Sequence, residues 1–144
     1  MTTVYEWRGA FTNQEVNALH AEAFNTRVFE ESGWNWVELV HRHSLGWVVA
    51  REGAELVGFV NVLWDGLVHA WLQDTMVAAK ARGRSIGTHL VTWARDGARG
   101  QDASTCMWIS KTTTCARSIS APAVSRLPTP GCCYSTDQLL IRNR

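Results

Sequence analysis

The sequence predicts an α/β (α+β) domain built on a mixed, mainly antiparallel sheet that is flanked by helices. Two patterns lead to this prediction. Short segments in which apolar residues alternate or run together are separated by turn residues, which is typical of strands joined by hairpins. Other segments place apolar residues at helical spacing. At 144 residues the chain is long enough to bury a core, and we expect a single domain.

The N-terminal part is predicted to contain one strand and two helices. Residues 4–7 alternate in the manner of a short strand. Thr12 and Glu15 form a capping-box signature, which marks the start of a helix. A second helix is expected from about residue 35 to residue 43. The apolar faces of these helices are formed by Val16, Leu19, His20, Ala23 and Phe24 in the first and by Trp36, Leu39 and Val40 in the second.

Three strands and a third helix are predicted in the centre of the chain. Residues 45–52, 55–64 and 67–78 are β-rich and follow one another closely. Asp65-Gly66 is a strong hairpin signal between the last two segments, so the three strands are expected to form an antiparallel meander. A helix follows, and its apolar face is formed by Ile86, Leu90, Val91, Ala94 and Ala98.

The composition gives no sign of a nucleic-acid or membrane partner. The formal net charge is +1, which is too small to attract nucleic acid or an anionic membrane. No apolar run approaches the ~20 residues of a membrane helix, and residues 1–15 lack the pattern of a secretory signal. The four cysteines contain no CxxC pair, so neither a metal site nor a disulfide framework is expected. The expected location is the cytoplasm.

Residues 76–91 carry the strongest chemical signal. A strand ends at Val77, a short turn follows, and the next helix begins with backbone amides that are able to bind an anion. Arg82 and Arg84 add positive charge, which suits a phosphate or pyrophosphate. The segment is neither a Walker A loop nor a dinucleotide-binding fingerprint, because it lacks the Gly-Lys-Ser/Thr ending of the first and the glycine spacing of the second. The alternative interpretation is a basic turn without a ligand.

This segment resembles motif A of the GCN5-related N-acetyltransferase (GNAT) superfamily. Residues 77–87 match the pattern Val-x-Pro-x-x-Arg-Gly-x-Gly-x-Gly/Ala, except that Ala79 replaces the proline and Ser85 replaces the second glycine. The order of strands and helices over about residues 3–100 is similar to that fold. The resemblance implies that acetyl-CoA is the co-substrate, with its pyrophosphate on the amides of residues 82–88. The implied cofactor-binding residues are Met76, Val77, Arg82, Gly83, Arg84, Ser85, Ile86, Gly87 and Thr88.

The resemblance also implies direct attack on the acetyl group by a primary amine of a small molecule or a peptide, without a Ser/His/Asp triad. Asp74 is the predicted catalytic base or amine-orienting group, and a purely structural carboxylate is the alternative. Asp65 and His69 are weaker candidates near the same hairpin. Trp36 and His69 are predicted to contact the substrate. The tryptophans that either line an acceptor pocket or pack in the core are Trp34, Trp36, Trp64 and Trp71.

The chain changes character near its C-terminus, and we divide it into an N-acetyltransferase-like domain over residues 1–108 and an atypical tail over residues 109–144. Residues 103–144 hold one acidic residue, five Lys or Arg, twelve Ser or Thr and all three prolines. Such a composition permits a disordered tail. The resemblance implies a splayed fifth strand and then a helix with a Phe-Tyr pair, whose tyrosine protonates the leaving thiolate. The sequence after Trp108 shows neither feature.

The genetic code offers a second explanation of the tail. In a shifted reading frame, each new codon consists of the last base of one codon and the first two bases of the next. Read in this way, the codons of residues 106–125 are able to encode a peptide that contains Phe-Tyr and Cys-Gly-Phe at the family's spacing. We therefore interpret the tail as an out-of-frame translation that begins near residues 99–105. A lost fifth strand would leave the fourth strand with an open edge, and residues beyond about 110 would pack irregularly.

Three functions are compatible with these observations. The first is acetyl transfer to an amine by an acyl-CoA-dependent N-acetyltransferase. The second is a non-catalytic acyl-CoA-binding relic, since the region of the general acid is missing. The third is a nucleotide- or phosphate-binding interaction domain that uses the basic turn. A homodimer is compatible with such a fold, and the acceptor amine is not named by the sequence.

Overall fold

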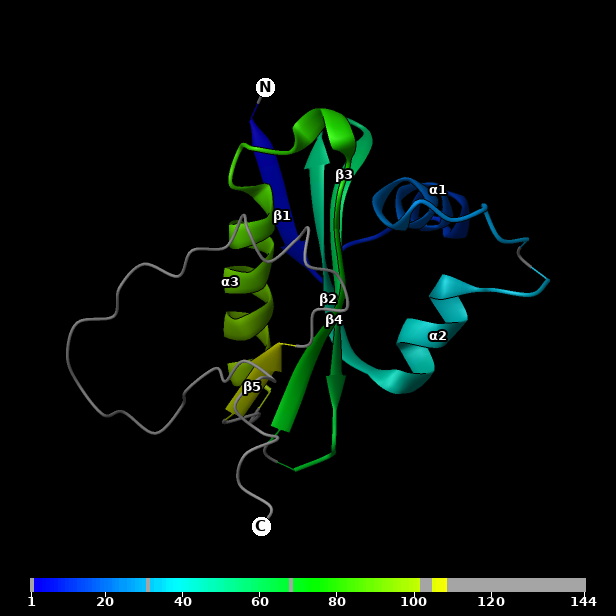
Figure 1. Cartoon of the computed structure of the whole chain (residues 1–144). Coiled ribbons are helices and arrows are strands. Elements are labelled where there is room, and N and C mark those ends of the chain that lie inside the picture. Colours follow the sequence, from blue (N-terminus) through cyan, green and yellow to red (C-terminus); the bar gives the residue numbers. More distant parts are fainter. Residues whose placement is uncertain (1, 31, 68, 102–104, 109–144) are drawn as a thin grey trace, which may run out of the picture.

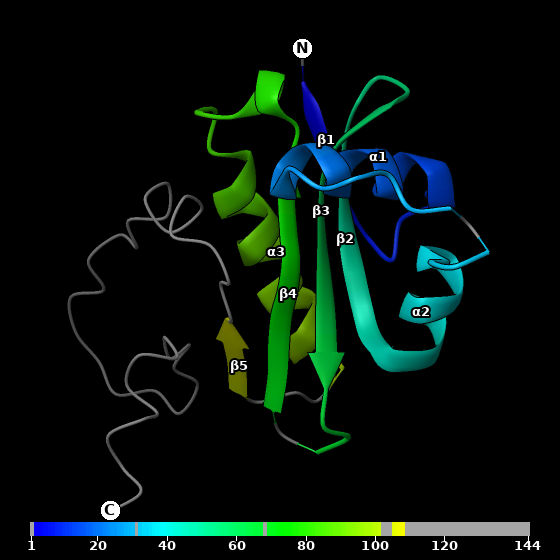
Figure 2. The same cartoon turned by 45° about the vertical axis from the view of Figure 1, so that its right-hand side comes forward.

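The computed structural model describes residues 2–30, 32–67, 69–101 and 105–108. These residues form a five-stranded sheet with α1 and α2 on one face and α3 on the other (Figures 1 and 2). This arrangement confirms the predicted fold class. In chain order the elements are β1 (Thr3–Trp7), α1 (Asn13–Phe24), α2 (Trp36–His43), β2 (Ser44–Glu52), β3 (Glu55–Trp64), β4 (His69–Val77), the 3-10 helix η1 (Ala79–Ala81), α3 (Ile86–Arg99) and β5 (Thr105–Trp108).

The first four strands form an antiparallel sheet in which each strand pairs with the next along the chain. Two tight connections set this order. Glu52 pairs with Glu55 across a turn in which Gly53 has a φ of 60°, a conformation that glycine adopts without strain. At the next connection the Asp65 carboxylate accepts a hydrogen bond from the Leu67 amide at 2.8 Å. The predicted meander is confirmed.

A short fifth strand continues the sheet beyond β4. Residues 105–108 run parallel to β4 and pair with residues 69–72. The fourth strand was expected to have an open edge, and this expectation is wrong over residues 69–72, where β5 pairs with it. Irregular packing was predicted beyond about residue 110, and that prediction lies outside the described residues.

The helices on the α1–α2 face begin at the residues that the sequence indicates. The Thr12 hydroxyl accepts from the Glu15 amide at 3.2 Å, while the Glu15 carboxylate accepts from the Thr12 amide at 2.7 Å. This reciprocal pair is the predicted capping box. α2 begins after Asn35, whose side-chain oxygen accepts from the Glu38 amide at 3.0 Å. Each cap satisfies amide groups that a helix leaves without a partner in its first turn.

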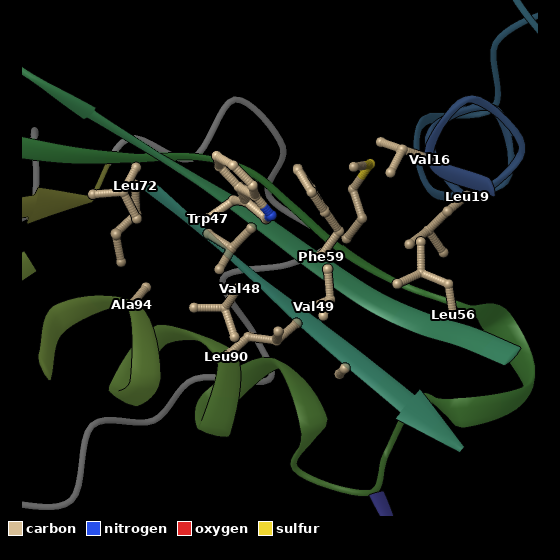
Figure 3. Close-up of a cluster of buried hydrophobic side chains, with 14 of the residues drawn as sticks. Val16, Leu19, Trp47, Val48, Val49, Leu56, Phe59, Leu72, Leu90 and Ala94 are labelled. Carbon is tan, nitrogen blue, oxygen red and sulfur yellow. The ribbon is translucent and has the colours of Figure 1, made fainter. Parts of the chain in front are cut away.

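The core lies on both faces of the central strands (Figure 3). Val16 and Leu19 of α1 pack towards β3, where Phe59 is completely buried. On the opposite face, Val48 of β2 packs towards Leu90 of α3, and both are completely buried. The sheet is therefore a rigid platform whose two sides are held by different helices.

Candidate functional site

A β-bulge interrupts the pairing of β3 with β4 close to the carboxyl end of β4. The register slips between Phe59 and Asn61, so that Asp74 and Thr75 lie opposite the single residue Val60. Bulges bend a strand, increase its twist and are common next to active sites. Asp74 has a φ of 52°, in a left-handed region where Asp is one of the few residue types that are enriched. The predicted catalytic carboxylate therefore sits on an irregular piece of backbone and not on a regular strand.

The bulge begins two residues beyond Leu72, the last residue of β4 that pairs with β5. β5 pairs with residues 69–72 of β4, and among the described residues no strand pairs with this edge over residues 73–77. An unpaired strand edge presents backbone donors and acceptors to an incoming chain or ligand. Met76 and Val77, which were predicted to contact the acetyl-CoA arm, lie in this stretch.

The turn after β4 leads into a helix that begins without a side-chain cap. Gly83 and Ser85 have φ values of 75° and 62°, and α3 starts at the next residue, Ile86. The Ser85 side chain makes no capping hydrogen bond. Within the described segments, no backbone carbonyl pairs with the amides of residues 83–88. These amides, together with the positive end of the α3 dipole, form a site that suits an anion such as a pyrophosphate.

The basic side chains of this turn bind the protein itself. Arg82 donates from Nε to the Val77 carbonyl at 3.1 Å. Arg84 pairs with Glu52 of β2, and this ion pair lowers the pKa of Glu52 because the guanidinium donates to its carboxylate. Lys80 forms an ion pair with Glu55. In this structure these three cations brace the turn, and the backbone amides of the turn are the groups that suit an anion.

The turn is also tied to α1 on the opposite face of the sheet. Glu22 of α1 accepts a hydrogen bond from the Ala79 amide at 2.9 Å. α1 in addition packs against β3 and β4 (Figure 2). The anion site at the start of α3 and the α1 side of the bulge are therefore held in one rigid frame.

Five aromatic rings gather on the α1–α2 side of the sheet, and we call them the ring cluster. His20 lies at its centre, with ring centroids 4.8 Å from Phe24, 5.9 Å from Phe29, 6.4 Å from Trp34 and 5.5 Å from Trp36. Phe29 and Trp34 also stack on each other at 5.1 Å. Trp36 is completely buried, whereas Trp34 keeps 38% of its surface exposed. The ring cluster thus has a buried floor and an open outer side.

The charge of Asp74 on β4 acts on His20 of α1. Burial lowers the pKa of His20 below its ordinary value, and the negative charge of Asp74 opposes this shift. A neutral imidazole close to a carboxylate is suited to take up a proton. His20 could not be assigned to the site from the sequence, because its helical spacing with Phe24 is also that of an ordinary core position.

The two residues that were predicted to contact the substrate, His69 and Trp36, lie in different parts of the structure. His69 is at the opposite end of β4 from Val77, and its ring nitrogen Nδ1 is 2.8 Å from the Asp65 carboxylate. It precedes Asp74 by five residues, about 16 Å along an extended strand. Trp36 is held within the core, where its indole nitrogen donates to Asn17 at 3.0 Å. The structure therefore places Trp36 in the ring cluster beside His20, and His69 at the end of β4 away from Val77.

Trp34 also borders a cleft of about 300 Å³ between the start of α2 and the residues that precede it. This volume is at the lower end of the range for small-molecule pockets. The residues that line the cleft are Ser32, Gly33, Trp34, Asn35, Glu38, Leu39, Arg42 and His43. Glu38 and Arg42 form an exposed ion pair at 3.3 Å on α2. Trp34 thus lies between the ring cluster and an open cleft of polar character.

The described residues contain neither a cluster of metal ligands nor a membrane-spanning helix. In the part of the chain that the structure describes, no group of three or more His, Cys, Asp or Glu side chains is arranged to hold a metal ion. No helix in the same part is long and apolar enough to cross a membrane.

Comparisons with solved structures place this arrangement among known folds. A GNAT family acetyltransferase from Streptococcus pneumoniae has a TM-score of 0.60 at 19% identity, covering 78% of this chain and 80% of its own. A GNAT family acetyltransferase from Brucella melitensis, solved with acetyl-CoA, has a TM-score of 0.59 at 18% identity and covers 79% and 80%. An aminoglycoside 6'-N-acetyltransferase solved with coenzyme A has a TM-score of 0.54 at 21% identity and covers 62% and 49%. These structural similarities show that this chain shares the fold of these proteins.

The family itself is shown by the sequence. No functionally curated protein sequence matches this chain. The model of the acetyltransferase (GNAT) family, however, matches residues 3–121, which include the bulged fourth strand, the turn that follows it and the uncapped start of α3. Together with the fold, this match means that the chain belongs to the GNAT family of acetyltransferases.

Proposed function

We propose that the protein transfers an acetyl group from acetyl-CoA to a primary amine of a small molecule or a peptide by direct attack of the amine. The observation that carries this proposal is the start of α3, which follows a bulged strand and has the positive end of the helix dipole. Among the described residues, no backbone carbonyl pairs with the amides of residues 83–88 there. Solved neighbours of the same fold hold acetyl-CoA or coenzyme A, which supports the choice of co-substrate.

Different residues of the turn and of β4 would bind different parts of acetyl-CoA. The amides of residues 83–88 would bind the pyrophosphate. The edge of β4 at Met76 and Val77, which pairs with no other described strand, would pair with the extended pantetheine arm. Arg82 and Arg84 would hold the turn in shape through Val77 and Glu52 and would add positive charge around the phosphates. The side chain of Ser85 would stand next to the pyrophosphate and offer a hydroxyl to it.

Asp74 would act on the amine as a base or as an orienting group. It lies on the bulge, two residues before Met76, and therefore next to the strand edge where the acetyl group would be held. The amine nitrogen forms a bond to the acetyl carbon, the carbon–sulfur bond breaks, and the thiolate takes up a proton. This reaction needs a neutral amine and a well-placed thioester but no metal and no covalent enzyme intermediate.

Thermal unfolding with acetyl-CoA, coenzyme A and ATP in parallel tests the binding part of the proposal. Acetyl-CoA and coenzyme A should raise the Tm, because a ligand at about 100 times its Kd stabilises the folded state by about 2.7 kcal/mol. ATP should raise it less. A preference for ATP would favour a nucleotide-binding domain and would contradict the proposal.

A thiol-release assay with a panel of primary amines tests the chemical step. Amine-dependent release of coenzyme A thiol is expected for an active enzyme. A clear Tm shift with acetyl-CoA but no release with any amine would instead assign the chain to the acyl-CoA-binding relics. Asp65→Asn is a matched control for Asp74→Asn, because Asp65 lies at the far end of β4 and should leave the rate unchanged.

A further inference from the structure

The ring cluster on the α1–α2 side is not needed to hold acetyl-CoA, and it points to the kind of amine that is acetylated. We propose that the ring cluster is the acceptor pocket, that it takes a primary amine attached to an apolar or aromatic group, and that His20 accepts the proton of that amine. This inference rests on the proposed function and names the substrate class of the same site.

The position of the ring cluster supports this assignment. α1, which carries His20, packs against β4, and the bulge of β4 carries Asp74. The carboxylate of Asp74 is close enough to shift the pKa of His20. An amine that lies between His20 and Asp74 is therefore next to the free edge of β4, where the acetyl group would be held.

The chemistry of the ring cluster favours an apolar amine. Trp34 keeps 38% of its surface exposed while it stacks on Phe29, so the two rings present an open aromatic surface beside a histidine. Stacking of a further ring or an alkyl chain on such a surface is favourable. The cleft next to Trp34 gives room for the rest of a small ligand.

The charge that acts on His20 suits a single ammonium group. Asp74 is the one charged group in the described residues that shifts the pKa of His20. Glu22, on the same helix, is bonded to the Ala79 amide. The Arg27 guanidinium lies 5.6 Å from the centre of the Phe29 ring and adds positive charge. Asp74 can balance one ammonium group next to His20, whereas Arg27 and Glu30, which flank Phe29 in the same loop, carry opposite charges.

The proton transfer is consistent with the surroundings of His20. Its Nδ1 lies 3.4 Å from the Thr26 hydroxyl, which leaves Nε2 to the amine. Nε2 accepts one proton from the ammonium form and frees the nitrogen lone pair. The nitrogen then bonds to the acetyl carbon as the carbon–sulfur bond breaks, and its second proton goes to the thiolate. Asp74 stabilises the imidazolium that forms, and His20 returns its proton to water.

Isothermal titration calorimetry on the full chain, with and without coenzyme A, tests the pocket independently of activity. We expect 2-phenylethylamine to bind at least tenfold more tightly than 1,4-diaminobutane. Trp34→Ala should weaken that binding about tenfold, because an aromatic pair contributes up to about 1.5 kcal/mol. Trp93→Ala is the matched control, since Trp93 is 44% exposed but stacks on Tyr5 on the α3 side. The assignment of the ring cluster as the acceptor pocket would be overturned by tighter binding of 1,4-diaminobutane, or by an equal loss of 2-phenylethylamine affinity in both variants.

The pH profile of kcat/KM with 2-phenylethylamine tests the role of His20. The wild-type rate should fall at acidic pH as His20 becomes protonated, and His20→Gln should remove this limb and lower kcat about 100-fold. Asp74→Asn should shift the limb to lower pH, because the carboxylate raises the pKa of His20. An acidic limb that neither variant changes would overturn the role of His20. Failure of every amine to release thiol would overturn both this role and the proposed function. In that case the calorimetry still tests whether the ring cluster binds an apolar amine.

Discussion

Ser85 and Gly83 occupy the same left-handed backbone region within one turn, although only one of them is glycine. A side chain in this region costs about 1–2 kcal/mol, and the flexibility that glycine adds to the unfolded chain offsets about 0.4–1 kcal/mol of that. We therefore expect Ser85→Gly to raise the free energy of unfolding by about 0.5–1 kcal/mol. Gly83→Ala should lower it by about 1 kcal/mol, since a Cβ there meets no neighbour and only the φ matters. Urea unfolding measures both, and changes of the same sign would contradict this reasoning.

The free energy of unfolding should depend on the protonation of Glu15 at low pH. Arg51 donates to its carboxylate at 2.8 Å and lowers the pKa of Glu15 from 4.5 to about 2. Because the folded-state pKa is the lower one, the stabilisation is complete above pH 4.5 and is lost as the pH falls towards 2. The pair is partly exposed, so we expect a loss of about 1 kcal/mol. Glu15→Gln should remove this pH dependence in urea unfolding, while Glu38→Gln, in an exposed helix pair, should keep it.

Individual residues were predicted from the sequence where local pattern decides their role. The capping box at Thr12 and the turn at Asp65 depend on neighbours within a few positions, and both are present as predicted. His20 was missed because its partners Phe29, Trp34 and Asp74 come from a loop and a strand that only the fold brings to it. Trp36 was predicted to contact substrate, and its complete burial makes it the floor of the ring cluster.

At the level of elements, α3 is fixed on the sheet by a close contact with β1. A Cβ added to Gly97 would lie 2.2 Å from the Trp7 ring, whereas one added to Gly87 of the same helix would lie 3.7 Å from Val77. Gly97→Ala should therefore lower the free energy of unfolding by about 1–3 kcal/mol through overpacking. Gly87→Ala should be neutral or raise it by up to about 1 kcal/mol through helix propensity. Thermal unfolding of the two variants measures the difference, and equal Tm values would contradict this packing.

The order of the elements could be predicted because each strand and helix has its own apolar period. The predicted ranges 45–52 and 55–64 agree with β2 and β3 to within a residue. The bulge at Asp74 could not be predicted in the same way, because it exists only in the register between β3 and β4. The parallel partner of β4 was missed for a similar reason: residues 105–108 are recognised as a strand only when β4 is present beside them.

At the level of the whole molecule, the bulge and the anion site follow one another beyond the part of β4 that pairs with β5, and the ring cluster lies on the α1 side of the sheet. The family match extends to residue 121, and so beyond the last residue of β5. Residues 109–144 lie outside the described residues, and their interpretation as an out-of-frame translation stays a prediction from codon phase. If it holds, the residues that complete the GNAT sheet and supply its tyrosine are encoded in the neighbouring frame.

Restoring that frame tests the prediction on the intact protein. A variant that carries the alternate peptide from residue 106 onwards should bury more apolar surface against β4 and α3 than the present tail. We expect its Tm to rise by about 5 °C or more and its thiol release to exceed that of the present chain. A chain that ends after Trp108 is the control, because it removes the tail without adding the alternate peptide. The reading-frame hypothesis fails if the coding DNA uses codons that exclude the alternate peptide, or if the restored variant is no more stable than the control.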